Sequence, residues 1–501
     1  MTKYIFMMTN GKHWFDLAKN LYENRIAEPI LWLGDDTHYD KAKLLYGDKV
    51  LKMQTYIHNP YLISNLNYEG EYSGFFLSEN YIRAKDRCLK KMDRLDLYSS
   101  FSRLDREAYF HNLTISFLKK ITVKPNFLLV AENPHSHAQY LVYEICLYLK
   151  VPVYKFNNWM PVPLIFLENI SSGKRIEKPN NLAETNVDIK IDKSIEDFVN
   201  QIYLKREQNE FFYMKNQRLS NSISSRFKTF FGNDLKKSYR DIKHNIGMIL
   251  KSRYNPINPF RLNFLIRSYV IFKRKKNLYN SMIKNQVDPD YSKKYVYFPL
   301  HFEPERTSNP DGGVFHDHFL ALVKLREFLP PNIKIYVKEH PSQILMKIMS
   351  EKGSRGRSPL FYGLIKNIKN LEVVNTKENS VKLILNSVFV ATLTGTVALE
   401  ASILGKKTLT FGNTWYRGCP NTHQWSLELK CSQLIDDEIH NHTEIKSFLQ
   451  MLKSKYSICG VQNGGQKRFF KDFFSTEFEN QQSNELYFLM SNFIKNETYL
   501  N

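Results

Sequence analysis

The 501-residue sequence has only five cysteines, no long apolar run, and fewer acidic residues (50) than basic ones (71). The cysteines are scattered and no Cys-x-x-Cys pair occurs, so neither a structural zinc site nor a disulfide framework is expected. No stretch approaches the ~20 apolar residues that cross a bilayer, which argues against a membrane-spanning helix. The first apolar core, YIFMM, is too short for the hydrophobic region of a signal peptide. We therefore expect a cytoplasmic protein.

Two phosphate-binding signatures are also missing. The sequence contains neither GxGxxG nor GxxxxGK[ST], so a typical dinucleotide-binding domain and a P-loop are not supported. Apolar residues nevertheless make up 43% of the chain, which excludes wholesale disorder. The length fits a folded protein of two or three domains.

Basic residues are concentrated in one segment. The net charge is +21, and residues 205–276 hold 18 Lys and Arg against four acidic residues, an excess of 14. Phenylalanines interleave with these basic residues at roughly helical spacing. Composition leaves three interpretations open: a solvated helical linker, a nucleic-acid surface, or a face that rests on anionic lipid headgroups.

Short apolar runs alternate with helix-length stretches on both sides of this segment, as in the βαβ units of a parallel sheet. The runs are KYIFMMT, PILWLGDD, NFLLVAENPHSH and VPVYKFNNW before it, and KYVYFPLHFEPE, NIKIYVKEHPSQ, LEVVN, SVFVATLTGT and KTLTFGNTWY after it. We predict an α/β protein with a Rossmann-like domain over residues 1–175 and a basic, mainly helical insert over 176–290. A second Rossmann-like domain would cover 291–465, and a helical segment over 466–501 could cross back to the first domain.

Polar residues follow these runs, at the carboxyl ends of strands where ligands bind in such sheets. In TLTGT, Gly395 lets the backbone approach a ligand, and the hydroxyls of Thr394 and Thr396 can hold a phosphate at the start of the next helix. Glu400, one turn into that helix, is placed to accept hydrogen bonds from a ribose. A threonine cap followed by a solvated glutamate is the alternative interpretation.

Three motifs in this order, LHFEPE, KEHPS and TGTVALEA, resemble the carboxyl-terminal half of the capsule polysaccharide biosynthesis proteins. The segment NPHSHAQYLVYEICLYLKVPVYKF is similar to part of that family's amino-terminal half. The resemblance implies a GT-B-like fold, with two Rossmann-like domains facing across a cleft and the basic helical insert between them. It also implies a glycosyltransferase that builds capsular or other surface polysaccharide or glycolipid from a nucleotide-sugar, which is CMP-Kdo in members with known chemistry.

The same resemblance assigns roles in the donor site. His340, in a His-Pro motif with Pro341, would donate a hydrogen bond to the departing phosphate, on which negative charge builds. Lys338 would add positive charge there or be solvated, and Glu339 would orient a neighbour or the ribose. The threonines and Gly395 would hold the phosphate from the other side. This arrangement requires no metal and no cofactor, and no Asp-x-Asp pair stands in a convincing setting.

The base that activates the acceptor hydroxyl should come from the first domain. Its candidates stand at predicted strand ends: Asp35, Asp36, Glu132, His135 and His137. His135 is preferred because its Pro-His pair matches the family segment. In the second domain, Glu303 and Glu305 form a carboxylate pair with either a loop role or a role at the donor sugar.

Two other functions stay open. A nucleotide-sugar 2-epimerase would use the same architecture without an acceptor, and a nucleic-acid-binding protein would explain the charge but not the polar motifs. Taken with the family resemblance, the charge predicts that residues 205–276 hold a peripheral membrane enzyme at the inner membrane surface. There it would meet a lipid-linked or oligosaccharide acceptor, and no nucleic-acid partner is expected.

Overall fold

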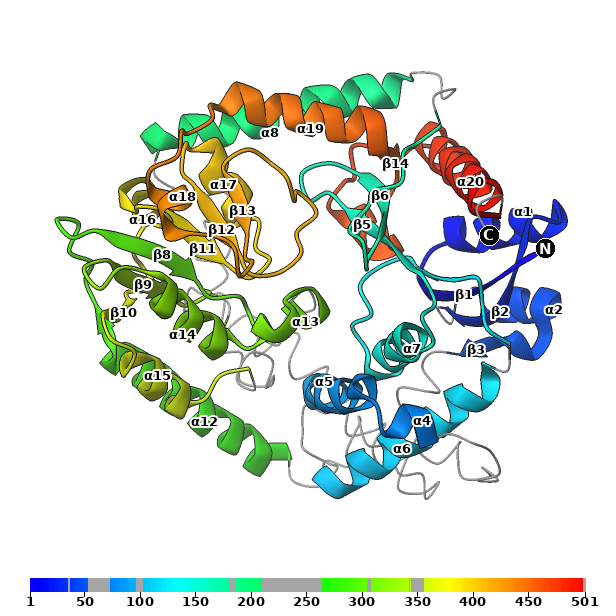
Figure 1. Ribbon diagram of the computed structural model, residues 1–501, viewed down its shortest axis with the longest axis horizontal. Coiled ribbons are helices and arrows are strands. Elements are labelled where there is room, and N and C mark those ends of the chain that lie inside the picture. Colours follow the sequence, from blue (N-terminus) through cyan, green and yellow to red (C-terminus); the bar gives the residue numbers. More distant parts are fainter. Residues whose placement is uncertain are drawn as a thin grey trace. The chain divides into compact units, whose positions relative to one another are not determined.

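The computed structural model describes residues 1–34, 37–52, 73–95, 102–121, 123–179, 185–208, 264–303, 308–341, 343 and 356–498. The chain folds as two compact units (Figure 1). The first contains Met1–Asp197 and Leu449–Asn501, and the second takes most of the chain between them. Each unit is built on one seven-stranded sheet. The prediction of an α/β fold with two Rossmann-like domains is confirmed.

The first sheet has the strand order β14-β6-β5-β4-β1-β2-β3. Its strands are β1 (Thr2–Thr9), β2 (Ala27–Gly34), β3 (Val50–Lys52), β4 (Phe127–Val130), β5 (Val153–Asn158), β6 (Leu164–Asn169) and β14 (Ser457–Cys459). β1 to β5 are parallel, whereas β6 runs antiparallel to β5 and β14 runs antiparallel to β6. β14 lies inside the range 291–465 that the sequence assigned to the second domain, but it pairs with the first sheet.

The helices of the first unit come from both its amino-terminal and its carboxyl-terminal segment. They are α1 (Lys12–Glu23), α2 (Tyr39–Tyr46), α4 (Ser73–Phe76), α5 (Glu79–Leu95), α6 (Arg103–Lys120), α7 (His137–Tyr148) and α20 (Thr476–Thr498), with the 3-10 turns η1 (Gly47–Lys49) and η5 (Gly464–Arg468). α20 contributes Phe493 to the core, where its ring centre lies 4.5 Å from that of Tyr154 and 5.6 Å from that of Phe127. The carboxyl-terminal helix therefore completes the core of the first unit.

The second sheet is parallel throughout, with the order β13-β12-β11-β8-β9-β10-β7. Its strands are β7 (Gln286–Val287), β8 (Tyr295–Pro299), β9 (Lys334–Lys338), β10 (Leu371–Val374), β11 (Val390–Thr392), β12 (Thr408–Thr410) and β13 (Thr422–Gln424). The apolar runs quoted from this half of the sequence thus form β8 to β12. Their continuous apolar character follows from burial on both faces of a parallel sheet.

Helices cover the two faces of this sheet. They are α12 (Phe264–Lys284), α13 (Ser308–Asp311), α14 (His318–Phe328), α15 (Pro359–Lys366), α16 (Ser380–Asn386), α17 (Val397–Ile403) and α18 (Cys431–Ile435), with the 3-10 turn η4 (Gly313–His316). Val296 and Phe298 of β8 pack in one core cluster with side chains of α12, α14 and α15. The alternate residue Tyr295 points to the other face, where its hydroxyl donates to a carbonyl of α16.

Two further helices carry the chain between the units. α8 (Asn186–Gln208) leaves the first unit and α19 (His442–Tyr456) returns to it. Lys453 of α19 lies 2.6 Å from Asp192 of α8, and the ring centres of His442 and Tyr203 lie 4.0 Å apart. Within the predicted basic insert 176–290, α8 and α12 are helical, β7 is a strand of the second sheet, and residues 209–263 lie outside the described residues.

Candidate functional site

The second sheet has a topological switch point between β8 and β11. From β8 the chain continues to β9 and β10 on one side, and then returns to β11 on the other side. Connections on opposite faces leave a crevice at the carboxyl ends of the two central strands, where open α/β sheets bind ligands. LHFEPE follows β8, KEHP ends β9 and TLTGT ends β11. The sheet therefore brings the described parts of all three motifs to one edge.

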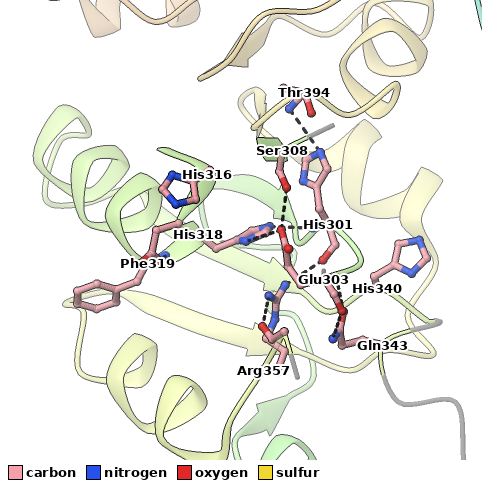
Figure 2. Close-up of polar contacts among 12 residues, drawn as sticks. His301, Glu303, Ser308, His316, His318, Phe319, His340, Gln343, Arg357 and Thr394 are labelled. Carbon is pink, nitrogen blue, oxygen red and sulfur yellow. Dashed lines mark hydrogen bonds and ion pairs between the residues drawn. The ribbon is translucent and has the colours of Figure 1, made fainter. Parts of the chain in front are cut away.

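His301, directly after β8, is held by three neighbouring segments (Figure 2). Its backbone N–H donates to Nε2 of His318 at 3.1 Å, and its carbonyl accepts from Nη2 of Arg357 at 2.9 Å. Its ring points to the loop after β11, where Nε2 accepts the backbone N–H of Thr394 at 3.4 Å. His301 is thus fixed at both its peptide groups and its ring.

His318 opens α14 and is almost completely buried. Burial holds the pKa of His318 well below its usual value, and the charge of Arg357 adds to this shift. Because Nε2 of the neutral ring accepts a hydrogen bond, its proton is on Nδ1, which faces Oε1 of Glu303 at 3.6 Å. The same carboxylate oxygen accepts from the hydroxyl of Ser308 at 3.0 Å.

The backbone of Glu303 is clamped by a side-chain amide. Oε1 of Gln343 accepts the N–H of Glu303 at 2.7 Å, and Nε2 of Gln343 donates to its carbonyl at 2.9 Å. Gly356 packs against the same residue, since a Cβ atom there would lie 2.2 Å from Cβ of Glu303. A glycine is required at position 356 for this close approach.

Glu339 has a structural role that the sequence did not resolve. Its Oε1 accepts the N–H of His340 at 2.8 Å. Its Oε2 accepts from Nε of Arg357 at 2.9 Å and from the hydroxyl of Tyr362 at 2.8 Å. The Glu339–Arg357 ion pair is fully buried, and the same guanidinium holds the His301 carbonyl. Glu339 therefore positions the loop after β8 through Arg357.

Lys338 is buried rather than solvated. Its ammonium donates to the carbonyl of Glu378 at 2.6 Å and to the hydroxyl of Ser380 at 2.7 Å, at the start of α16. These two contacts tie the end of β9 to the beginning of a helix on one face of the sheet. The positive charge stays near the switch point, but the ammonium is already bound to protein groups.

His340 is half-buried, and Pro341 follows it at the same edge. Burial lowers the pKa of His340, the charges of Arg357 and Lys338 lower it further, and Glu339 opposes the shift. The ring centre of His340 lies 5.9 Å from that of Phe302. A neutral imidazole at this edge can donate one hydrogen bond from its protonated nitrogen.

The loop after β11 contains buried hydroxyls. Oγ1 of Thr392 and Oγ1 of Thr394 are closed to solvent and form no hydrogen bond with any described residue. Thr396 precedes α17 but its side chain does not cap the helix. A Cβ atom at Gly395 would lie 3.0 Å from Oγ1 of Thr392 and 3.2 Å from Nε2 of His301. Gly395 therefore keeps space open between these two groups.

Glu400 is buried in α17 and not solvated. Burial raises the pKa of Tyr297, and the nearby charge of Glu400 raises it further. Tyr416 is buried close to the same carboxylate, and its hydroxyl donates to the carbonyl of Gly395 at 2.5 Å. Tyr416 thus lies between Glu400 and the loop that contains Gly395.

The first sheet has its own switch point, between β1 and β4. Glu132 follows β4, and its Oε2 accepts from Nδ2 of Asn463 at 2.7 Å. His135 is half-buried in the same loop, where its Nδ1 lies 3.1 Å from the carbonyl oxygen of Asn133. His137 is completely buried in the first turn of α7. The candidates of this loop therefore lie at the carboxyl end of β4, the edge at which open α/β sheets generally bind ligands, and His137 is the most buried of them.

Three predicted residues, Asp35, Asp36 and Glu305, lie outside the described residues. Within the described ranges, no group of three or more His, Cys, Asp and Glu side chains is arranged to hold a metal ion.

Sequence reasoning missed His301, His318, Gln343 and Arg357. His318 follows Asp317, whose side chain caps α14 at the backbone N–H of Phe319, so a helix start could have been read there. Gln343 and Arg357 carry no local signal, because their contacts reach residues 40 and 56 positions away.

No protein-family model and no curated protein sequence matches the chain. Similar solved structures include KpsC of Thermosulfurimonas dismutans, a beta Kdo 2,7 transferase, at 14% identity and a TM-score of 0.28, covering 77% of this chain and 92% of that chain. They also include the UDP-GlcNAc 2-epimerase of Methanocaldococcus jannaschii, at 12% identity and a TM-score of 0.24, covering 90% of this chain and 99% of that chain. Alignments of such low similarity do not separate a transferase from an epimerase.

Proposed function

We propose that this chain is a glycosyltransferase of the GT-B type that takes its sugar from a nucleotide-sugar donor bound by the second unit. The observation that carries the proposal is the meeting of three polar strand ends at the switch point between β8 and β11. The family resemblance of LHFEPE, KEHPS and TGTVALEA supports a donor of the CMP-Kdo kind and a product in capsular or other surface polysaccharide or glycolipid.

The chemistry proposed for this edge is stabilisation of the departing phosphate. His340 is kept neutral by burial, so it donates one hydrogen bond to a phosphate oxygen as negative charge builds there. The hydroxyls of Thr394 and Thr396 would contact the phosphate from the loop after β11. Lys338 contributes its charge from a distance, since its ammonium is bound to α16. This route requires no metal and no cofactor.

We assign activation of the acceptor hydroxyl to the loop after β4 in the first unit. His135 stays the preferred base, because its ring is half-buried at a strand end. Glu132 is the second candidate, and its contact with Asn463 fixes the carboxylate in place.

The acceptor in this proposal is lipid-linked and is met at an anionic membrane surface. In the described part of the basic segment, the side chains of Lys273, Arg274 and Lys276 are exposed, whereas Lys275 is buried. Tyr279 and Ile283, further along α12, are also exposed. Basic residues near anionic headgroups each contribute about 1 kcal/mol, and exposed aromatic and aliphatic side chains add apolar contact. No described helix is long and apolar enough to cross a membrane.

Nucleotide binding and product analysis test the proposal. CMP, UDP and GDP are each added to the full chain, and the melting temperature is measured. A nucleotide at a hundred times its Kd adds about 2.7 kcal/mol to the stability of the state that binds it. The nucleotide that stabilises the protein is then supplied as its sugar conjugate, with and without a lipid-linked acceptor.

Sugar transfer that depends on the acceptor supports the transferase. Conversion of the sugar nucleotide without any acceptor would instead identify a nucleotide-sugar 2-epimerase. If none of the three nucleotides stabilises the chain, the donor site is wrong.

A further inference from the structure

His301 lies in a loop, yet three hydrogen bonds hold its backbone and its ring. His318 holds the backbone N–H of His301 and Arg357 holds its carbonyl, and each of them in turn contacts a carboxylate, the half-buried Glu303 or the buried Glu339. Burying ionised and polar groups in such a network costs free energy unless every contact is made. All the contacts of this network hold one residue, and they fix its imidazole between the ends of β8 and β11.

The hydrogen bonds of that imidazole define its protonation. Nε2 accepts the N–H of Thr394, so the proton of the neutral ring is on Nδ1. Burial, with the nearby charge of Arg357 and the ring of His340, lowers the pKa of His301 to about 3, which keeps the ring neutral at physiological pH. Nδ1 is therefore a hydrogen-bond donor.

This donor has no acceptor in the described part of the chain. Nδ1 of His301 is closed to solvent and forms no hydrogen bond with any described residue, and the same holds for Oγ1 of Thr392 and Oγ1 of Thr394. The His301 ring and Oγ1 of Thr392 are neighbours, because a Cβ atom at Gly395 would lie 3.2 Å from Nε2 of the ring and 3.0 Å from Oγ1 of Thr392. Thr394 belongs to the same loop, and its N–H contacts the ring at Nε2. Buried polar groups without partners are rare, and each costs about 1 to 3 kcal/mol.

We propose that His301 is a ligand-contacting residue of the donor site, and that its neutral imidazole donates a hydrogen bond from Nδ1 to a phosphate oxygen of the bound nucleotide. This inference rests on the proposed function, and it adds a residue which that function does not use. The contact between Nε2 and Thr394 is long, at 3.4 Å, so the ring can shift by a few tenths of an ångström when the ligand arrives. His318 and Arg357 act as positioning residues for this donor.

Two substitutions of His301 distinguish the role of Nδ1 from the role of Nε2. In His301→Asn, the side-chain amide can take the place of Nδ1, whereas in His301→Gln it reaches the place of Nε2. We expect His301→Asn to keep nucleotide affinity within a factor of about three of the wild type. His301→Gln, which keeps the contact to Thr394 but loses the donor, should weaken the affinity about tenfold or more.

The affinity is measured from the shift in melting temperature with CMP, UDP and GDP and with the corresponding nucleosides. The loss in His301→Gln should appear with the phosphorylated ligand and not with its nucleoside. Wild-type protein that responds to a nucleotide while His301→Gln responds equally would overturn this inference and leave the proposed function standing. Wild-type protein that responds to none of the three would overturn both.

A second pair of variants covers the case in which His301→Gln does not fold. His318→Gln keeps an acceptor near the place of Nε2 for the His301 N–H, and His318→Asn does not reach it. We expect His318→Gln to restore nucleotide affinity relative to His318→Asn. Equal affinities in this pair, or equal losses in both His301 variants with equally lowered melting temperatures of the free protein, would assign the ring a purely structural role and contradict the proposal.

Discussion

At the residue scale, the charged groups near the switch point between β8 and β11 hold the fold together. Glu339 and Arg357 form a buried pair, and Lys338 is bound to the start of α16. Removing one partner of a buried pair leaves an uncompensated charge and costs about 3 to 5 kcal/mol. Variants of these three residues would therefore report on folding as well as on binding. His340, half-buried beside them, is the better probe of chemistry.

His340→Ala should lower the rate of sugar transfer by a factor of about 10² to 10³, because it removes a donor to the departing phosphate. The measurement is turnover with saturating donor, together with the melting temperature of the free protein. His440→Ala is the matched control, since this histidine is exposed in the same unit. A folded His340→Ala variant with near-normal turnover would disprove the assignment.

The buried His13 should make the folded protein less stable at acidic pH. Burial lowers its pKa to about 3, opposed by a hydrogen bond to the backbone of Val461. Between the unfolded value of about 6.5 and that folded value, the unfolded chain binds a proton that the folded chain does not, so stability falls as pH falls. Above pH 6.5 this group contributes no pH dependence.

The expected slope from His13 is on the order of 1 kcal/mol per pH unit. Unfolding by urea is measured between pH 5 and pH 7 for the wild type and for His13→Asn, which keeps a donor near Nδ1. The free energy of unfolding should depend less steeply on pH in the variant. Identical slopes would mean that His13 is protonated in the folded protein.

At the scale of elements, α20 is as much a part of the first unit as the strands that precede it by several hundred residues. Phe493 packs on Tyr154 of β5 and on Phe127 of β4, and further residues of α20 belong to the same core cluster. Burial of this apolar face, rather than the helical propensity of α20, is what stabilises the helix in place.

Phe493→Ala should therefore destabilise the first unit by about 3 to 5 kcal/mol, through lost apolar burial and the cavity left behind. Phe488→Ala, on the same helix, is the control, because that side chain is 51% exposed. Urea unfolding followed by tryptophan fluorescence gives the difference, as Trp14 and Trp32 lie in the same core. Equal effects of the two substitutions would contradict the packing of α20 against the sheet.

At the scale of the whole molecule, the excess of positive charge is uneven. Residues 205–276 carry an excess of 14 of the net +21, and the described part of this segment exposes basic side chains on α12. An attraction to anionic headgroups acts over about a Debye length and weakens with salt. The proposed membrane contact is therefore an electrostatic one.

Reversing Lys273, Arg274 and Lys276 to glutamate should release the protein from vesicles rich in phosphatidylglycerol, while transfer to a soluble acceptor analogue is unchanged. Lys275 is kept, because it is buried and its reversal would perturb folding. The control reverses Lys3, Lys41 and Lys124, which are exposed in the first unit. If sedimentation with vesicles is insensitive both to the α12 substitutions and to salt, the membrane contact is wrong and the segment is a solvated linker.

The sequence by itself determined the strands, their polar ends and the two-domain division, because buried parallel strands must be apolar and their ends must be polar. It did not determine which way the polar side chains turn. Lys338 and Glu400 were expected to face the ligand or the solvent, and Glu339 to orient a neighbour or the ribose, and all three are buried. His301, His318, Gln343 and Arg357 meet only because the order β11-β8-β9 brings distant loops to one edge. Contacts over such distances in the chain depend on the packing of whole elements, which no local pattern of residues encodes.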